Sequence, residues 1–289
     1  MFESVAAVAV PFILAGLGGL LSEQAGVLNI SLEGCITLGA FTTALLITLG
    51  ISVPLAVCGA LVLGALFGLL LSGIHMGLKA NLFIAGMGIN LLIPSLSGLI
   101  SNGIWGHKGT LRIGSDYILS PVSWLMIPLT LLFILVIHRS CLGIRLKAAG
   151  LAPEFLSERG ISPNRVRIAA LTISSAMASL AGVFLVMRVD AYVPGMSSGR
   201  GWIALVLIWL GFRNSLGVLV SSYFFSLIMV LSNMAQGSTA LPAAMLKTLP
   251  YAATLVAFTI ASIRHSAPKF PRQRRRRVSG IRGGQLPTP

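Results

Sequence analysis

Nine apolar stretches, separated by polar turns, account for most of this sequence and constrain its fold more than any other feature. A helix needs about 20 predominantly apolar residues to cross the hydrocarbon core of a bilayer. Only 10% of the residues are charged, whereas soluble domains carry about 25%. We therefore predict an all-α polytopic membrane protein, with about eight or nine transmembrane segments within residues 1–264. The stretches are 5–21, 27–49, 52–74, 81–101, 120–138, 166–188, 199–213, 215–235 and 243–263.

One of the nine stretches is too short to cross the bilayer by itself. The purely apolar part of 199–213 runs only from Trp202 to Leu210. At about 1.5 Å per residue this part falls well short of the thickness of the hydrocarbon core. We predict that it is a broken or re-entrant segment, buried among its neighbours.

Basic residues gather in one loop and at the end of the chain. The formal net charge is +14. Residues 139–167 hold six basic and two acidic groups, and from Arg264 onward there are eight basic residues and no acidic one. Basic loops beside apolar spans follow the positive-inside rule, which favours a membrane orientation over binding of nucleic acid. We expect residues 265–289 to form a disordered basic tail in the cytoplasm.

The same distribution predicts which loops lie on which side of the membrane. The basic loop and the turn 75–79 are expected inside. The order of the segments then agrees with an outside N-terminus and an inside C-terminus only if 199–213 returns to the cytoplasmic side. No basic residue precedes the first apolar stretch, so we do not expect a cleaved signal peptide. The loops expected outside are 102–119, 189–198 and 236–242.

The stretch 52–74 carries a stripe of small residues, namely Ala60, Gly64, Gly68 and Ser72. Small residues at every fourth position let two helix backbones approach closely. We interpret the stripe as a packing surface, either within the chain or between two protomers.

A polar cluster at 22–34 interrupts an otherwise apolar sequence with Glu23, Asn29 and Glu33. Burying an ionisable residue within a membrane segment costs free energy, so such a residue is a candidate for a functional role. Three glycines at 16, 18 and 19 precede the cluster, so we expect the helix to break and re-form there. Asn29 and Glu33 share one helix face. They form either a polar patch on a translocation path or a structural cap, with the carboxylate bonded to N–H groups at the break.

A second cluster, 196–202, places Arg200 between two glycines and next to Trp202 at the start of the short apolar segment. Arg200 either serves a solute or pairs with Glu23 or Glu33. The structural alternative is an interfacial Arg and Trp that anchor the end of a helix. Asn90 and Asn233 lie within or at the ends of spans, where hydrogen bonds between helices explain them adequately. The candidate residues of a substrate path are thus Glu23, Asn29, Glu33, Asn90, Arg200, Trp202 and Asn233.

No arrangement typical of an enzyme occurs in the sequence. There is no HExxH motif, and no histidine lies beside a Ser or Cys in a recognisable nucleophile setting. Three cysteines are scattered without CxxC spacing, which argues against a metal site. Because a P-loop is also absent, the chain cannot hydrolyse ATP by that device. We expect no catalytic residue, metal or other cofactor.

The basic loop contains the signals of a short helix. Pro153 and Glu154 are typical of a first helical turn, and Gly160 is typical of a helix end. A helix of under two turns is marginal alone. Because it displays Phe155 and Leu156 among charged residues, it is suited to docking into a groove of a partner.

Several motifs together resemble those of ABC-importer permeases of the branched-chain amino acid and simple-sugar type, nearest the nucleoside permeases. The loop is similar to the cytoplasmic coupling loop of that family, and the other motifs follow in the expected order over nearly the whole chain except the tail. The loop motifs are Gly143–Gly150, Pro153, Gly160-Ile161-Ser162 and Arg167–Ala170, and the others are Ser22–Gly34, Ala178–Val183, Gly199–Leu205 and Leu249-Pro250-Tyr251.

The resemblance implies a multi-pass permease subunit in the inner (cytoplasmic) membrane, paired with a second copy of itself or with a sister permease. A cytoplasmic ABC ATPase would bind the coupling loop, 139–165. An exported solute-binding protein, periplasmic or a lipoprotein, would deliver a small solute. Nucleosides come first, then simple sugars, then ribityl compounds such as riboflavin. The residues that the resemblance assigns to coupling are Gly150, Pro153, Glu154, Phe155, Arg159 and Gly160.

One alternative to an ATP-driven permease remains open from the residues themselves. An ion-coupled secondary transporter needs carboxylates within the membrane, and Glu23 and Glu33 are available for that role.

Overall fold

The structure is a computed structural model that describes residues 2–106, 110–114 and 140–235, with the single positions Thr248, Ala252, Val256 and Thr259. The predicted segment 120–138, most of 243–263, the loop 236–242 and the tail 265–289 lie outside the described residues.

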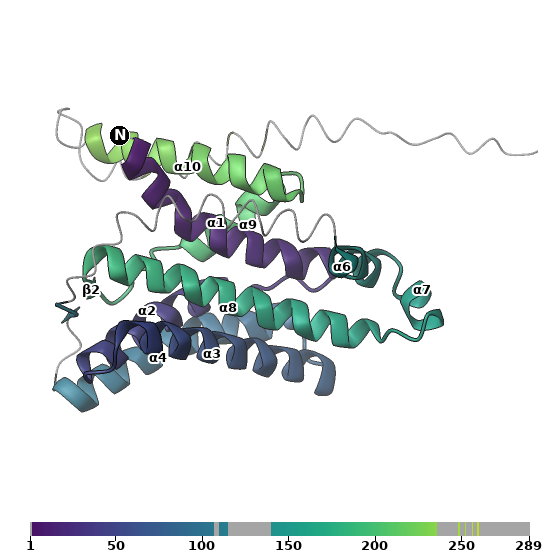
Figure 1. Cartoon of the computed structure of the whole chain (residues 1–289), viewed down its shortest axis with the longest axis horizontal. Helices are drawn as coiled ribbons and strands as arrows, with labels where there is room; N and C mark the ends of the chain where they lie inside the picture. The colour runs from purple at the N-terminus through teal and green to yellow at the C-terminus, as the bar shows by residue number, and fades with distance from the viewer. Residues whose placement is uncertain are drawn as a thin grey trace, which may run out of the picture.

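The seven predicted segments that fall within the described residues all form helices (Figure 1). Five of these helices are long and apolar enough to cross a membrane. They are α1 (Phe2–Gln24), α3 (Val53–Ser72, extended by the π-helical turn η1, Gly73–Gly77), α4 (Leu82–Trp105), α8 (Pro163–Val189) and α10 (Ser215–Ala235). Two shorter apolar helices are α2 (Leu32–Thr48) and α9 (Arg200–Leu210). The basic loop contributes α6 (Cys141–Leu151) and α7 (Pro153–Glu158).

Local signals fix several of the helix ends. The side chain of Asn81 accepts a hydrogen bond from the N–H of Phe83 and caps the start of α4. Gly106, with φ of +71°, ends the same helix. The short helix predicted in the basic loop is confirmed as α7, with Pro153 in its first turn and Gly160, at φ of +73°, just beyond its end.

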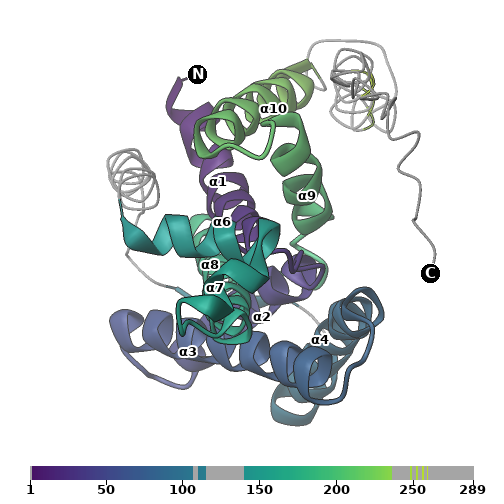
Figure 2. The same ribbon diagram turned by 90° about the vertical axis from the view of Figure 1, so that its right-hand side faces the viewer.

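Helix α8 lies at the centre of the described bundle (Figures 1 and 2). It packs against α1, α2 and α3, and α10 and α9 cover the other side of α1. Buried apolar side chains of α1, α2, α8 and α9 form one cluster, which includes Leu14, Leu32, Ile36, Ala181 and Ala204. Because α8 is central and long, the residue of α8 that a segment contacts indicates how deep in the bundle that segment lies.

Close backbone contacts explain how α8 accommodates so many neighbours. The small-residue stripe of α3 faces α8: an added Cβ at Gly64 or Gly68 would approach the Cβ of Ser179 or the Cα of Thr172 within 2.5 and 2.7 Å. The Ser179 hydroxyl donates a 2.7 Å hydrogen bond to the carbonyl of Ala60. The stripe is therefore a packing surface within the chain.

The contact between α2 and α8 predicts the first mutational effect. A Cβ at Gly182 would collide with the carbonyl oxygen of Ile36 and would lie 2.7 Å from the N of Ala40, both backbone atoms of α2. Overpacking typically costs about 1–3 kcal/mol and more where backbone must move, so we expect Gly182→Val to lower the Tm by about 10 °C or to prevent purification of folded protein. Thermal unfolding in detergent measures this. Gly103→Val in α4 is the matched control, because nothing lies within 4 Å of a Cβ there. Equal Tm values for the two variants would contradict the interpretation.

The helix break predicted at 22–34 is confirmed, but the glycines expected to cause it do something else. Helix α1 is continuous to Gln24, the chain is non-helical through residues 25–31, and α2 begins at Leu32. Gly16 and Gly19 lie within α1, where an added Cβ would approach Val218 and Ile208 within 2.8 and 2.7 Å. They permit close packing, and the turn at the start of the break contains Gly26, with φ of +79°.

Two loops predicted on the same side of the membrane lie at the same end of the bundle. The loops expected outside meet in a two-stranded antiparallel ladder, in which β1 (Leu111–Arg112) pairs with β2 (Ala191–Tyr192). This ladder corrects the purely helical prediction, because the short strands form only when the two loops are brought together by their helices. The end of α9 returns to the opposite side, where Arg213 lies beside Glu23. With 11 residues, α9 is about half the length needed to cross the hydrocarbon core.

Candidate functional site

The N-termini of the two short helices meet in the interior of the bundle. Glu33, in the first turn of α2, accepts hydrogen bonds from the N–H groups of Gly199 (2.8 Å, to Oε1) and Gly201 (2.7 Å, to Oε2) at the start of α9. These donors have no partner within their own helix, and the positive end of the α9 dipole favours the carboxylate. The structural interpretation of Glu33 is therefore the one that its contacts support.

The approach of α9 to α2 requires a glycine at 201. A Cβ there would collide with the backbone N of Glu33 and would lie 2.6 Å from its Cα. The hydroxyl of Thr37, one turn further along α2, donates a 3.1 Å hydrogen bond to Ser197. Residues 196–201 are thus held against the first turns of α2 by backbone contact as well as by the carboxylate.

Two asparagine side chains bond to several polar groups at the break. Asn29 donates 3.0 Å hydrogen bonds to Ser174 and Ser175 of α8 and accepts from the N–H (3.0 Å) and hydroxyl (2.6 Å) of Ser31. Asn90 of α4 accepts from the N–H of Gly34 (2.7 Å) and donates to the carbonyl of Ile30 (2.8 Å). In a membrane interior, backbone outside a helix is tolerated only when its polar groups are bonded in this way.

The contact with Ser174 and Ser175 places the helix break about halfway along α8, in the interior of the bundle. Both serines are near the middle of α8, which spans 27 residues from Pro163 to Val189. A long helix, a non-helical segment and a short helix occur in this order twice, as α1–α2 and as α8–α9, and α1 and α8 run in opposite directions. Half-helix N-termini that meet near the midplane are typical of the binding region of membrane transporters.

Glu23 lies at the end of α1 and has a different partner from Glu33. Its Oε1 is 2.9 Å from Nη2 of Arg213, whose guanidinium also lies 5.4 Å from the centroid of the Trp209 ring. The Gln24 side chain donates a 3.4 Å hydrogen bond to the carbonyl of Arg213. Arg213 therefore ties the α9–α10 turn to α1. Glu23 thus pairs with Arg213, a partner that no local pattern in the sequence indicates.

The other three predicted path residues are more peripheral. Arg200 donates to the carbonyls of Met196 (2.6 Å) and Ser197 (3.1 Å), which agrees with an anchoring role at the helix start. Trp202 is 39% exposed and shares one face of α9 with Trp209. Asn233 is exposed in the last turn of α10. The structure brings Asn29, Glu33 and Asn90 together around the start of α2, and Asn233 belongs to another helix end.

The predicted coupling residue Gly150 lies directly against the helix break. A Cβ at Gly150 would collide with the carbonyl oxygen of Gln24 and would lie 3.0 Å from the N of Gly26. Arg167 of α8 joins the two segments, since Nη2 donates to the carbonyl of Ala149 (3.0 Å) and Nε to that of Ala25 (3.3 Å). The end of α6 and the break in the membrane domain thus form one contact.

The other predicted coupling residues form the exposed tip of the loop. Glu154, Phe155, Arg159 and Gly160 are exposed and Pro153 is half-buried. The Arg159 guanidinium lies 4.7 Å from the centroid of the Phe155 ring. The stacked Arg159 and Phe155 side chains, next to the exposed Gly160, form a compact surface that is available to a partner.

A cavity of about 310 Å³ lies between the second half of α4 and the segment 192–195 that follows α8. It is lined by Pro94, the hydroxyl side chains of Ser95, Ser97, Ser101 and Tyr192, and Pro194. Ser97 donates a 2.8 Å hydrogen bond to the carbonyl of Pro94 and shares a 3.1 Å hydrogen bond with Tyr192. Burial raises the pKa of the Tyr192 hydroxyl, and the bond to Ser97 offsets part of this effect. The wall of the cavity is therefore uncharged and rich in hydroxyl groups.

The comparison with known families decides the identity of the chain. A family described as "Branched-chain amino acid transport system / permease component" matches residues 1–258. The chain belongs to this family of ABC-transporter permeases. The permease is a non-catalytic, multi-pass subunit of an ABC importer in the cell membrane, and such importers work with ATPase and solute-binding partners. This result sets aside the ion-coupled alternative.

Curated relatives align along most of the permease. NupC of Lactococcus lactis, a nucleoside ABC transporter permease, is 25% identical over 90% of this chain and 91% of its own length. NupQ of Bacillus subtilis, a guanosine ABC transporter permease, is 27% identical over the same shares. TsgC13 of Haloferax volcanii, with glucose as its proposed cargo, is 32% identical over 75% of this chain and 71% of its own length.

Among solved structures, the permease is similar to an inward-facing conformation of a proposed metal-chelate type ABC transporter. The sequence identity is 18%, the similarity covers 91% of this chain and 84% of the other, and the TM-score is 0.48.

Proposed function

We propose that the permease imports nucleosides. The observation that carries this proposal is the alignment, along nine-tenths of the chain, with NupC and NupQ, whose names assign them nucleosides and guanosine. The outer cavity supports it, because its serine and tyrosine hydroxyls offer donors and acceptors to a ribose without a charged group. Riboflavin has no support among these relatives and is not proposed.

The meeting point of α2 and α9 is the proposed centre of the translocation path. Glu33 and Asn90 hold the two helix starts together, and Arg200 and Trp202 extend from the first turn of α9. Because the carboxylate of Glu33 is already bonded to two N–H groups, it positions α9 and leaves recognition of the solute to its neighbours. A neutral solute suits this arrangement, since the fixed charge is already compensated.

The coupling step that we propose starts at the exposed loop tip. A cytoplasmic ABC ATPase binds α7 and the end of α6, through residues that include Pro153, Glu154, Phe155, Arg159 and Gly160. Its movement on ATP binding shifts Gly150 against the segment 25–31. That segment leads directly into α2, so the shift reaches Asn29 and Glu33 and opens the path to the cytoplasm.

The permease is proposed to pair with a second permease, either another copy or a sister chain, and to receive solute from an exported solute-binding protein. The half-exposed face of α9 that carries Trp202 and Trp209 is available to line a path shared between two subunits. Glucose, the proposed cargo of TsgC13, makes sugars the competing solute class.

Uptake by the assembled transporter tests the solute class. The permease, its ATPase and its binding protein, reconstituted in proteoliposomes, are expected to accumulate labelled guanosine only when ATP is inside. A tenfold excess of unlabelled adenosine should compete, whereas glucose should not. Accumulation of glucose without nucleoside would overturn the proposal in favour of sugar transport. Accumulation driven by an ion gradient without ATP would contradict the coupling scheme.

A further inference from the structure

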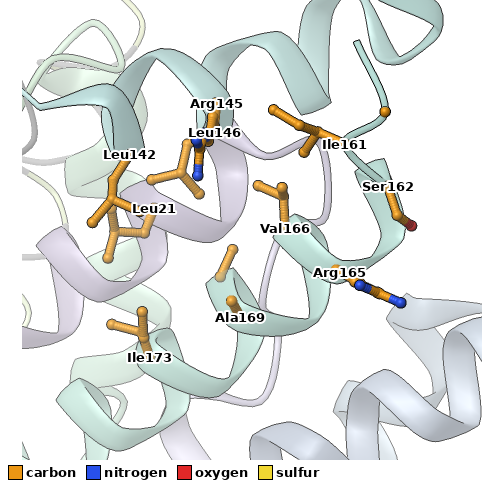
Figure 3. A pocket seen from close by; sticks show the side chains of 12 residues that line it. Leu21, Leu142, Arg145, Leu146, Ile161, Ser162, Arg165, Val166, Ala169 and Ile173 are labelled. Carbon is orange, nitrogen blue, oxygen red and sulfur yellow. The ribbon is translucent and has the colours of Figure 1, made fainter. Parts of the chain in front are cut away.

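A second cavity, of about 510 Å³, opens at the cytoplasmic end of the bundle between α1, α6 and the first turns of α8 (Figure 3). Its volume is within the range of small-molecule sites, about 300–1,000 Å³. Most of its lining is apolar, from residues that include Leu21, Leu142 and Ile173. Of the lining residues, Gly160 alone belongs to the proposed coupling surface and none belongs to the proposed substrate path, so the cavity needs its own explanation.

The two ends of the cavity differ in character. Figure 3 shows Leu21, Leu142 and Ile173 gathered at one end, and Ser162 and Arg165 at the other, with the side chain of Arg145 between them. Arg165 is in the first turn of α8 and Ile173 is eight residues further along the same helix, which is about 12 Å deeper. The cavity therefore runs from the level of the basic loop into the hydrocarbon region.

From its middle, at Arg145, to its polar end, at Arg165, the cavity carries a positive charge that no ion pair with a described residue neutralises. Arg145 and Arg165 are both exposed, and neither makes an ion pair with a described residue. Ser162, just before α8, makes no capping hydrogen bond, so the first N–H groups of α8 add a partial positive charge at the same place. An anionic group with several oxygen acceptors complements this end, and guanidinium groups bind phosphate through paired hydrogen bonds.

We propose that this cavity binds one anionic phospholipid of the inner leaflet. Its phosphate lies at the arginine end and an acyl chain lies along Leu21, Leu142 and Ile173. The argument is one of complementarity: a basic, apolar-lined pocket between helices on the cytoplasmic side matches a molecule with a negative head and an apolar tail. The bound lipid would join α6 to α8, that is, the coupling loop to the central helix of the membrane domain.

Native mass spectrometry of the full-length permease in mild detergent tests the proposal. Phosphatidylglycerol is titrated against phosphatidylcholine with the same acyl chains. The wild type is expected to bind one phosphatidylglycerol at least about tenfold more tightly than phosphatidylcholine. The R145Q/R165Q variant is expected to bind the two lipids with about equal affinity. Lys147→Gln is the matched control, because Lys147 is exposed on α6 but does not line the cavity; it should bind as the wild type does.

Two further measurements separate the lipid from other occupants. Ala169→Phe places a ring in the cavity and should remove bound lipid without a change in charge. This variant also tests the proposal if R145Q/R165Q does not fold. Glycerol 3-phosphate should not displace the lipid. Equal phosphatidylglycerol affinity in the wild type and in R145Q/R165Q or A169F would overturn the proposal, as would full displacement by glycerol 3-phosphate. Loss of ATPase binding in A169F with lipid binding intact would assign the cavity to a protein partner instead.

Discussion

Replacing Glu33 with glutamine will lower ATP-driven uptake at least about fivefold and will lower the stability of the permease. The carboxylate accepts hydrogen bonds from Gly199 and Gly201 through two different oxygens. An amide presents only one acceptor, so one N–H at the start of α9 would face an NH₂ group. An unsatisfied buried donor costs about 1–3 kcal/mol, and about 1.4 kcal/mol corresponds to tenfold in an equilibrium. Uptake in proteoliposomes and Tm in detergent are the measurements.

The control for Glu33→Gln is Glu3→Gln, which removes the same charge from an exposed position at the start of α1. It should leave both uptake and Tm unchanged. If Glu33→Gln imports solute at the wild-type rate with the wild-type Tm, the carboxylate does not hold the two half-helices together, and the proposed centre of the path is wrong.

A single methyl group at position 150 is expected to separate ATP hydrolysis from transport. In Gly150→Ala the new Cβ would clash with backbone atoms of Gln24 and Gly26, so α6 must move away from the helix break. Overpacking of about 1–3 kcal/mol at this contact should lower uptake at least about fivefold. The exposed residues of α7 are unaffected, so the ATPase should still copurify and hydrolyse ATP.

Gly88→Ala in α4 is the matched control for Gly150→Ala, because an added Cβ at Gly88 has no atom within 4 Å. It should transport at the wild-type rate. Loss of ATPase binding in Gly150→Ala would show that the contact builds the docking surface and does not transmit movement. Unchanged uptake would exclude the contact from coupling altogether.

Much of the architecture follows from signals that act over a few residues. The lengths of the apolar stretches predicted the helices within the described residues, and the short apolar part of 199–213 predicted that α9 would not span. Pro153 and Gly160 predicted α7 nearly to the residue. Charge asymmetry predicted that the loops carrying β1 and β2 share one side. Each of these depends on composition or on backbone restriction within one segment.

Sequence reasoning also predicted polar residues that the structure brings together around the start of α2, but left their role open. Asn29, Glu33 and Asn90 stood out because polar groups are costly in a membrane. Whether they faced a solute or bonded to helix ends depended on which segment lies opposite. Glu33 meets Gly199 and Gly201 across 166 and 168 residues of sequence, and no local pattern specifies such a pairing. The same holds for Arg213, whose partner Glu23 is on a distant helix.

By itself, the sequence determined that this protein is a polytopic membrane protein and that a helix breaks within residues 22–34. These properties follow from the transfer of each segment between water and lipid, and that transfer depends on the segment alone. Only the tertiary structure decided that the carboxylate at α2 bonds to the start of α9, that Gly150 contacts the break, and that a mostly apolar cavity with two arginines lies between α1, α6 and α8. Those contacts depend on how closely helix backbones approach, which is set by the packing of all the neighbouring helices together.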